Sequence, residues 1–474
     1  MIGMTLSRTS VVALLVVAWL GCGAEPRPHL FWITADTLRA DHTSLHGYAR
    51  ATTPRLEELA ADGLVYGQAI TLVPKTGPSF ATHLTGLDPA VHGVTSNRFS
   101  LPDARSGTAR SGSAQSGSSG AGILPERLAA AGYATAAFVA NPILAPRKGY
   151  ARGFGRYDEF GKQGSLEPQM RAFFEWAEQH DWSRPTFVWI HYIDPHGPYT
   201  PPADLRDRFV GDALFEAEAR RVPLDYELPE GVPPNRVLGA LPAYQRIGDE
   251  DRVAWYVSQY DAEIVAMDRA VGSLLDFLRE RDLYAGSGIV FTSDHGESLG
   301  EHDYYFEHGW YVYDASLRVP LVIKPPEGVA AASSDVQVSN LDTLPTFLAM
   351  AGLTSDPELP GRDLRNAPAE QPQVVANPST YPERFVAVRT PQYKYIREVA
   401  SGAEQTYQLV PDAHEEHDVT STEPKLVERL RADWSRHAVD WARSASAPAE
   451  RPRPGTLAPT AEEQRQLEHL GYVD

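Results

Sequence analysis

Cysteine is almost absent from this chain. Cys22 is the only cysteine among 474 residues, and a single thiol cannot form an intramolecular disulfide. Positive charge is also scarce, because 43 Lys and Arg residues stand against 62 Asp and Glu residues and leave a formal net charge of -19. A chain this acidic has no electrostatic footprint for nucleic acid, and it disfavours anionic membrane surfaces as partners.

A long hydrophobic run is lacking as well. The apolar run at residues 11–20 covers about ten residues, which is too short to span a bilayer and suits the h-region of a signal peptide. Cys22 follows directly, between two glycines, and this arrangement resembles a bacterial lipoprotein cleavage site. We therefore predict that residues 1–22 are a lipoprotein-type signal peptide. The protein would be exported, as a periplasmic or outer-membrane lipoprotein or at the cell surface, and would touch the membrane only through a lipid anchor at Cys22. A plain secreted protein with an incidental cysteine is the alternative.

Apolar runs and helical patterns alternate through residues 29–370. Compact apolar runs predict buried strands at residues 29–34, 133–139, 186–193, 288–292 and 317–324. A helical pattern is clearest at residues 253–283. This alternation predicts an α/β domain with a large, mostly parallel sheet and helices on both faces. Residues 104–120 are almost all small and polar, which predicts a flexible surface loop within the domain.

The pattern changes after about residue 370. Short strands are expected at residues 385–389, 393–396 and 407–409, followed by a helix at residues 423–442. We interpret residues 371–442 as a small α+β subdomain with an antiparallel sheet. Residues 443–474 are then expected to form a Pro/Ala-rich linker and a tail.

Acidic and histidine residues directly follow two of the predicted strands. Asp36 comes just after the first strand, and Asp294 and His295 follow the strand at residues 288–292. Ligand sites in open α/β sheets gather at the carboxyl ends of strands. Neighbouring carboxylate and imidazole groups there can bind one cation. Taken singly, each residue is explained as an ordinary turn former or helix cap, and it is their equivalent positions at strand ends that favour a site.

Thr76 lies at the start of a predicted helix that runs to Thr85. The N-terminus of a helix offers free amide donors and the positive end of the helix dipole, so it suits a bound oxyanion. A simple capping threonine is the alternative.

Four segments together resemble one known family. Residues 36–42, 76–86, 194–199 and 293–297 are similar, in order, to motifs of the sulfatase branch of the alkaline phosphatase superfamily. The resemblance extends from about residue 29 to residue 415. It implies an alkaline-phosphatase-like α/β/α sandwich with a small C-terminal α+β subdomain, and a hydrolase of anionic esters that needs a divalent metal.

The resemblance also implies roles for individual residues. Four positions match the metal site of the family: Asp36, Thr76, Asp294 and His295. Thr76 matches the nucleophile as well. Three positions match residues that bind the substrate: Asn97, His196 and His308. The two histidines match groups that can also protonate the leaving oxygen, and Asn97 matches an asparagine of the phosphonate monoester hydrolases and phosphodiesterases. His92 and Arg39 are expected to support the site or to be structural.

Several positions depart from the family pattern. The family signature begins with a Cys or Ser that is oxidised to formylglycine, whereas oxidation of Thr76 would give a ketone, so we expect no formylglycine. Thr37 replaces a second Asp, Phe80 replaces an Arg, and His308 replaces a Lys. Residues 138–142 also lack the Lys and His of a mid-chain family motif. These departures argue against ordinary sulfate ester hydrolysis.

We therefore predict a metal-dependent hydrolase with a Thr76 nucleophile that prefers phosphoryl or phosphonate esters to sulfate esters. The alternatives are a sulfuric ester hydrolase, a phosphoglycerol-type transferase and an inactive binding module. The ligand types suit one Ca, Mg, Mn or Zn ion. Candidates for a second metal are His302 and Asp303.

Overall fold

The computed structural model describes residues 27–102, 122–161, 166–226, 238–366, 374–376, 385–446 and 458–472. The predicted signal peptide with Cys22, the loop at residues 104–120 and most of the predicted linker lie outside these residues. In the described part of the chain, no helix is both long and apolar enough to cross a membrane.

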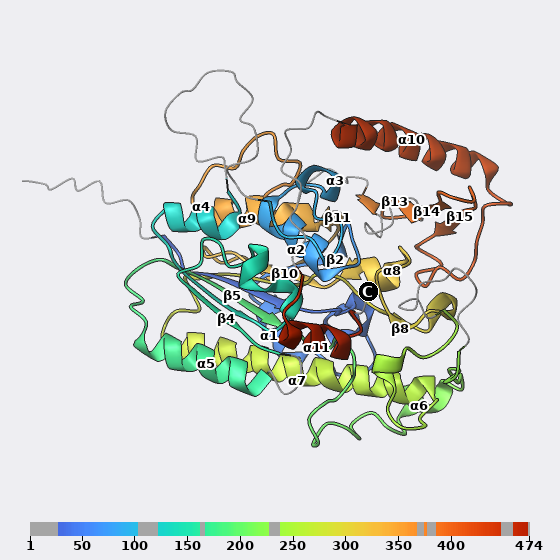
Figure 1. The fold of residues 1–474 in the computed structure, drawn as a ribbon. Coiled ribbons are helices and arrows are strands. Elements are labelled where there is room, and N and C mark those ends of the chain that lie inside the picture. The colour runs from blue at the N-terminus through green and yellow to red at the C-terminus, as the bar shows by residue number, and fades with distance from the viewer. Residues whose placement is uncertain are drawn as a thin grey trace, which may run out of the picture.

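A large mixed sheet forms the centre of the molecule (Figure 1). Its strand order is β11-β2-β10-β6-β1-β5-β3-β4, and β9 pairs with β2 at one side. The strands are β1 Leu30–Ala35, β2 Leu64–Ile70, β3 Ala134–Val139, β4 Arg156–Glu159, β5 Thr186–Tyr192, β6 Gly288–Ser293, β9 Arg318–Val319, β10 Leu321–Lys324 and β11 Ala332–Ser339. Only β9 and β10 pair antiparallel with their neighbours, so the predicted mostly parallel sheet is confirmed.

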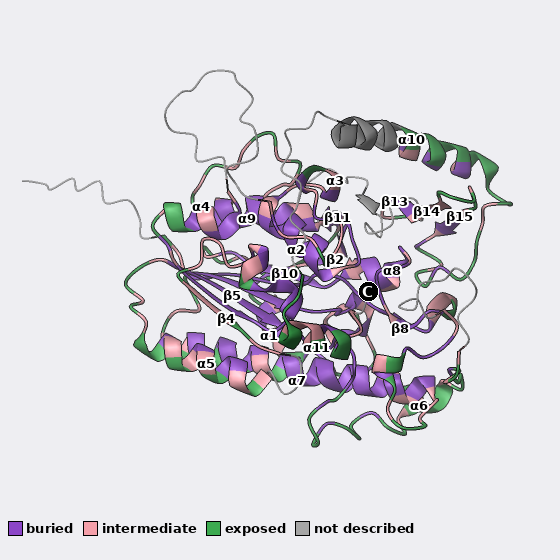
Figure 2. Ribbon diagram, in the orientation of Figure 1, coloured by how far each residue is buried: buried purple, intermediate pink, exposed green. Residues whose placement is uncertain are grey.

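Helices cover both faces of this sheet (Figure 1). One face packs against α1 Pro54–Ala60, α5 Leu166–Gln179 and α7 Val253–Glu280, and the other against α2 Thr76–Thr85, α4 Leu124–Ala130 and α9 Thr343–Met350. Side chains alternate across a strand, so Phe31 and Ile33 of β1 enter the first core while Leu30 and Trp32 enter the second. Because both faces are covered, the central strands are buried along their length (Figure 2).

A second, smaller sheet follows along the chain. Its order is β12-β13-β14-β15 and all its pairs are antiparallel. The elements are β12 Val374–Ala376, β13 Phe385–Arg389, β14 Tyr393–Glu398, β15 Glu404–Gln408 and the helix α10 Pro424–Ser446. The predicted antiparallel sheet is confirmed, with its last strand a few residues earlier than expected. Short elements complete the fold: α3 Pro89–His92, α6 Ala213–Ala217, the hairpin strands β7 Ser298–Leu299 and β8 Tyr305–Glu307, and α8 Asp314–Leu317.

Several parts of the chain differ from the sequence prediction, and β2, β4 and β11 were not predicted. The strand expected at residues 317–324 is divided into β9 and β10, because Pro320 lies between them and has no amide hydrogen for the ladder. The tail contains a helix, α11 Ala461–His469, that the sequence analysis did not predict. Leu470 follows α11 and packs against Ala140 and Ile193, the residues that follow β3 and β5.

Candidate active site

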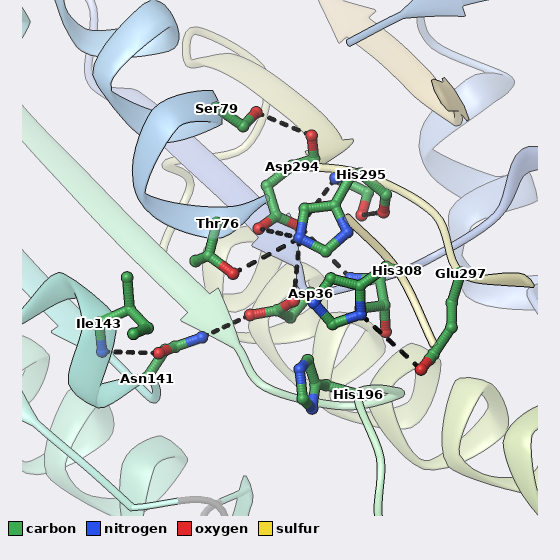
Figure 3. A network of polar contacts seen from close by, with 12 residues as sticks. Asp36, Thr76, Ser79, Asn141, Ile143, His196, Asp294, His295, Glu297 and His308 are labelled. Atoms are coloured by element: carbon green, nitrogen blue, oxygen red, sulfur yellow. Dashed lines mark hydrogen bonds and ion pairs between the residues drawn. The ribbon is translucent and has the colours of Figure 1, made fainter. Parts of the chain in front are cut away.

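Strand register brings the predicted metal ligands together. β1 and β6 are parallel neighbours, with Ala35 opposite Ser293. Asp36 and Asp294 are therefore adjacent at the carboxyl edge of the sheet, where His295 follows directly. These three residues form a buried group whose ligand atoms all lie within 4.8 Å of one another, so the predicted cluster of Asp36, Asp294 and His295 exists in the fold (Figure 3).

One oxygen of each carboxylate faces the cluster without a hydrogen bond. Asp36 Oδ1 and Asp294 Oδ2 are buried, and neither has a hydrogen-bond partner among the described residues. His295 Nε2 lies 3.9 Å from the first and 3.4 Å from the second. Buried polar atoms almost always have a partner, so two orphaned carboxylate oxygens that converge on an imidazole nitrogen suit a bound cation.

The other atoms of these side chains are fixed by the protein. Asp36 Oδ2 accepts a 2.6 Å hydrogen bond from the amide of Asn141. Asp294 Oδ1 accepts hydrogen bonds from the backbone amides of Thr37 and His295, at 3.3 and 2.9 Å. His295 Nδ1 lies 2.9 Å from the carbonyl oxygen of Gly296. A carbonyl only accepts, so Nδ1 carries the hydrogen and the lone pair of Nε2 faces the cluster, as metal ligation requires.

The electrostatics of the pair also fit a cation. Burial acts to raise the pKa of Asp36, but the neighbouring His191 and His196 outweigh it and lower that pKa to about 2. Burial and then the negative charge of Asp36 raise the pKa of Asp294 to about 6. Two neighbouring buried carboxylates resist joint ionisation. A divalent ion between them would remove that penalty.

Thr76, the first residue of α2, lies beside this cluster. Its Oγ1 is 3.5 Å from His295 Nε2 and 3.1 Å from the hydroxyl of Tyr472. The first turn of α2 is tied to its surroundings: Ser79 Oγ donates to the carbonyl of Asp294 at 2.7 Å, and Gly77 N donates to Asn97 Oδ1 at 2.9 Å. Asn97 thus reaches the site, where its side-chain oxygen fixes the turn that presents Thr76.

The two predicted substrate histidines line the same site. The ring of His308 lies 4.5 Å from that of His295 and 5.1 Å from that of His196, between centroids. His308 Nδ1 is 3.8 Å from Glu297 Oε1 (Figure 3). His196 Nδ1 lies 2.7 Å from the carbonyl of Gly197, and its Nε2 lies 2.9 Å from the hydroxyl of Tyr472.

Other residues singled out by the sequence have structural roles. Arg39 forms ion pairs with Asp41 and Glu301, both at 2.7 Å. His92 shares a 3.1 Å hydrogen bond with Thr82 inside the helical layer. His302 stacks on Tyr313 at 3.6 Å, and neither it nor Asp303 belongs to the metal-like group found among the described residues. The fold therefore gives no support for His302 and Asp303 as a second metal site.

Three residues of the site were missed by the sequence analysis: Asn141, His191 and Tyr472. Asn141 lies just after β3, which is the one signal that could have identified it. His191 belongs to β5 and lies with Nε2 3.4 Å from Asp36 Oδ2, but its place inside an apolar run made it look like core. Phe80, which replaces the expected Arg, packs edge-on against the ring of His191 at 4.8 Å.

The fold is an α/β fold in which Asp36, Asp294 and His295 form a buried cluster at the strand ends. The hydroxyl of Thr76, at the N-terminus of α2, lies beside this cluster. The family model described as Sulfatase matches residues 28–353. A second model, N-sulphoglucosamine sulphohydrolase, C-terminal, matches residues 300–436. The chain belongs to the sulfatase family.

Individual relatives are distant. The chain is 28% identical over 239 residues to a choline-sulfatase of Rhizobium meliloti, a match that covers 48% of this chain and 45% of the relative. It is 22% identical to a sulfatase of Formosa agariphila, with 86% of this chain and 88% of the relative covered. Among solved structures, the phosphonate monoester hydrolase of Silicibacter pomeroyi superposes with a TM-score of 0.68 at 18% identity, covering 91% of this chain and 99% of that one. The last match shows a shared fold.

Proposed function

We propose that this protein is a metal-dependent hydrolase of anionic esters in which the Thr76 hydroxyl is the nucleophile. The observation that carries the proposal is the position of Thr76 Oγ1, 3.5 Å from His295 Nε2, beside the orphaned oxygens of Asp36 and Asp294. Hydroxyl and cation site are thus adjacent at a helix N-terminus, where free amides favour an anionic group.

Asp36, Asp294 and His295 would bind one divalent cation, Ca, Mg, Mn or Zn. A bound cation would make the Thr76 hydroxyl more acidic and neutralise part of the substrate charge. Thr76 Oγ1 attacks the phosphorus or sulfur atom, and the bond to the leaving oxygen breaks. His196 and His308 lie beside the cluster, with the ring of His308 4.5 Å from that of His295 and 5.1 Å from that of His196, and are the groups that can give the leaving oxygen a proton.

Phosphoryl and phosphonate esters are the substrates we favour. A threonyl ester has no elimination route of the kind that releases sulfate from formylglycine. Water must therefore attack the phosphorus or sulfur atom itself, and phosphorus accepts that attack readily. The sulfatase names of several relatives favour sulfate esters, which makes sulfuric ester hydrolysis the second candidate function.

The cellular location is also a proposal. The apolar run at residues 11–20 with Cys22 behind it supports an exported protein, anchored through a lipid on Cys22. Labelling of the expressed full chain with a radioactive fatty acid would test this, because Cys22→Ser should abolish the label. Label retained in Cys22→Ser would refute the anchor.

The activity can be tested with four aryl esters of one leaving group: phosphate monoester, phosphate diester, phosphonate monoester and sulfate. The purified protein is assayed with each of the four metals in turn. We expect turnover of a phosphoryl or phosphonate ester that falls by more than about 10³-fold in Thr76→Ala. The matched control is Thr85→Ala, at the far end of α2, whose hydroxyl donates to the carbonyl of Ala81 and accepts from the backbone amide of Leu87, away from the cluster.

Each result decides between the candidates. Faster turnover of the sulfate ester, also lost in Thr76→Ala, would replace the phosphoryl preference by sulfuric ester hydrolysis. Activity that survives in Thr76→Ala would exclude Thr76 as the nucleophile. No turnover of any ester with any of the metals would favour a binding protein that keeps the fold.

A further inference from the structure

The segment at residues 458–472 is a defined structural unit. Thr460 caps α11, since its hydroxyl accepts from the amide of Glu463 while the Glu463 carboxylate accepts from the amide of Thr460. After the helix, Gly471 turns the chain with a φ of 77°. A Cβ at this position would lie 2.4 Å from the ring of Tyr244. The turn therefore needs glycine, and it directs Tyr472 toward the sheet.

This segment is fixed to the carboxyl edge of the central sheet. Leu470 is 1% exposed and packs against Ala140 and Ile193. Arg147 pairs with the carboxylate of Glu463 and donates a 3.2 Å hydrogen bond to the carbonyl of Ala458. An apolar contact and an ion pair thus attach α11 where β3 and β5 end, next to the site.

Tyr472 joins two residues of the proposed mechanism. Its hydroxyl oxygen lies 3.1 Å from Thr76 Oγ1 and 2.9 Å from His196 Nε2. The carbonyl of Gly197, 2.7 Å from His196 Nδ1, can only accept a hydrogen bond, so in neutral His196 the hydrogen is on Nδ1 and Nε2 accepts. The phenol must then donate to His196, which leaves its oxygen to accept from Thr76. The hydrogen-bond chain runs in one direction, from Thr76 through Tyr472 to His196.

We propose that Tyr472 is a catalytic residue that passes the Thr76 proton to His196. This inference rests on the proposed function. As Thr76 Oγ1 bonds to the phosphorus atom, its proton moves to the Tyr472 oxygen and the phenol proton moves to His196 Nε2. The leaving oxygen takes the proton from His196 as its bond to phosphorus breaks. In the second half a water molecule replaces the alcohol. Its oxygen bonds to phosphorus as the bond from phosphorus to Thr76 Oγ1 breaks, and its proton passes through His196 and Tyr472 to Oγ1, which restores Thr76 and neutral His196.

The test is Tyr472→Phe, which removes one oxygen atom and keeps the ring that packs beside Leu470. We expect kcat for the best ester to fall about 10²-fold, the usual size of a proton-transfer contribution, with little change in KM. The matched control is Tyr157→Phe, because the Tyr157 hydroxyl is also partly buried but bonds to the carbonyl of Leu144. It should leave kcat unchanged.

A second measurement needs no turnover and no metal. Nitrogen NMR of histidine-labelled, metal-free protein reports which ring nitrogen carries hydrogen, and His196→Asn assigns the signal. We expect hydrogen on Nδ1 of His196 in the wild type, and a shift of its Nε2 signal in Tyr472→Phe only.

The outcomes separate this inference from the proposed function. Activity that is lost in Thr76→Ala but kept in Tyr472→Phe would overturn the relay and leave the Thr76 nucleophile standing. A rise of kcat in Tyr472→Phe would overturn it too, since Tyr472 would then be an obstruction. An unshifted Nε2 signal would show that the hydrogen bond is absent, whatever the activity. A wild type inert toward all esters would remove the proposed function, and the relay with it.

Discussion

The side-chain amide of Asn141 donates a 2.6 Å hydrogen bond to Oδ2 of Asp36, and both side chains are fully buried. The bond uses one carboxylate oxygen and turns the other, Oδ1, toward Asp294 and His295. Asn141 lies within residues 138–142, where this chain lacks the Lys and His of the family motif. The amide carries no charge, so Asp36 keeps its full negative charge for a cation.

Asn141→Ala should weaken metal binding without abolishing it. Partners that orient a ligand typically contribute about 10- to 100-fold in metal affinity, and Asp36 would lose its orienting donor. Titration calorimetry with Mn²⁺ measures the change in Kd. Gln337→Ala is the control, because Gln337 is an equally buried amide that bonds to Arg389 instead. Equal Mn²⁺ affinity in Asn141→Ala and the wild type would show that this contact does not tune the site.

Asp294→Asn should stabilise the metal-free protein at neutral and higher pH. The pKa of Asp294 is raised from 3.8 to about 6 in the folded state, so the folded protein binds this proton more tightly than the unfolded chain. The contribution to the free energy of unfolding is therefore complete below about pH 3.8 and is lost as the pH rises through about 6. Asn cannot ionise and therefore avoids that loss. A pKa shift of about two units corresponds to a change in the free energy of unfolding of at most about 3 kcal/mol.

Thermal unfolding with EDTA and with excess Mn²⁺ measures this effect. In EDTA the melting temperature of Asp294→Asn should exceed that of the wild type at about pH 8, and the gap should close toward about pH 4. Mn²⁺ should raise the melting temperature of the wild type much more than that of the variant. An identical Mn²⁺ response in both proteins would refute Asp294 as a ligand.

The cluster of Asp36, Asp294 and His295 was predictable from the sequence because these residues directly follow buried strands. Parallel strands end at the same edge, and the register of β1 with β6 then places Asp36 beside Asp294. Thr76 was found through its place at a helix start and through the family resemblance.

Tyr472 could not be found in this way. It is 396 residues from Thr76 in sequence, and its position depends on tertiary contacts that no local pattern encodes. Leu470 must pack against Ala140 and Ile193, the residues that follow β3 and β5. Gly471 must also turn the chain against the ring of Tyr244. β11 was missed for a related reason: its first half is polar and exposed, so it has no apolar alternation and resembles a loop.

A buried ion cluster joins the second sheet to α8. Lys394 of β14 is fully buried, with Nζ 2.7 Å from Asp314 Oδ1 and 2.9 Å from Glu415 Oε1. Arg389 of β13 also pairs with Asp314 at 2.7 Å. Burial raises the pKa of Glu415 to about 7 even though Lys394 opposes the shift. Glu415 therefore depends on Lys394 to remain ionised.

Lys394→Met should lower the free energy of unfolding by about 3–5 kcal/mol, the usual cost of leaving a buried charge without its partner. Adding Glu415→Gln should recover part of that loss, because the amide needs no cation and its oxygen can still accept from the backbone amide of Asp314, as Glu415 does at 2.6 Å. Denaturant unfolding of both variants measures the coupling. Mn²⁺ affinity should stay at the wild-type value, which separates this structural cluster from the proposed metal site. A double variant no more stable than Lys394→Met would mean that Lys394 contributes through packing of its aliphatic stem rather than through its charge.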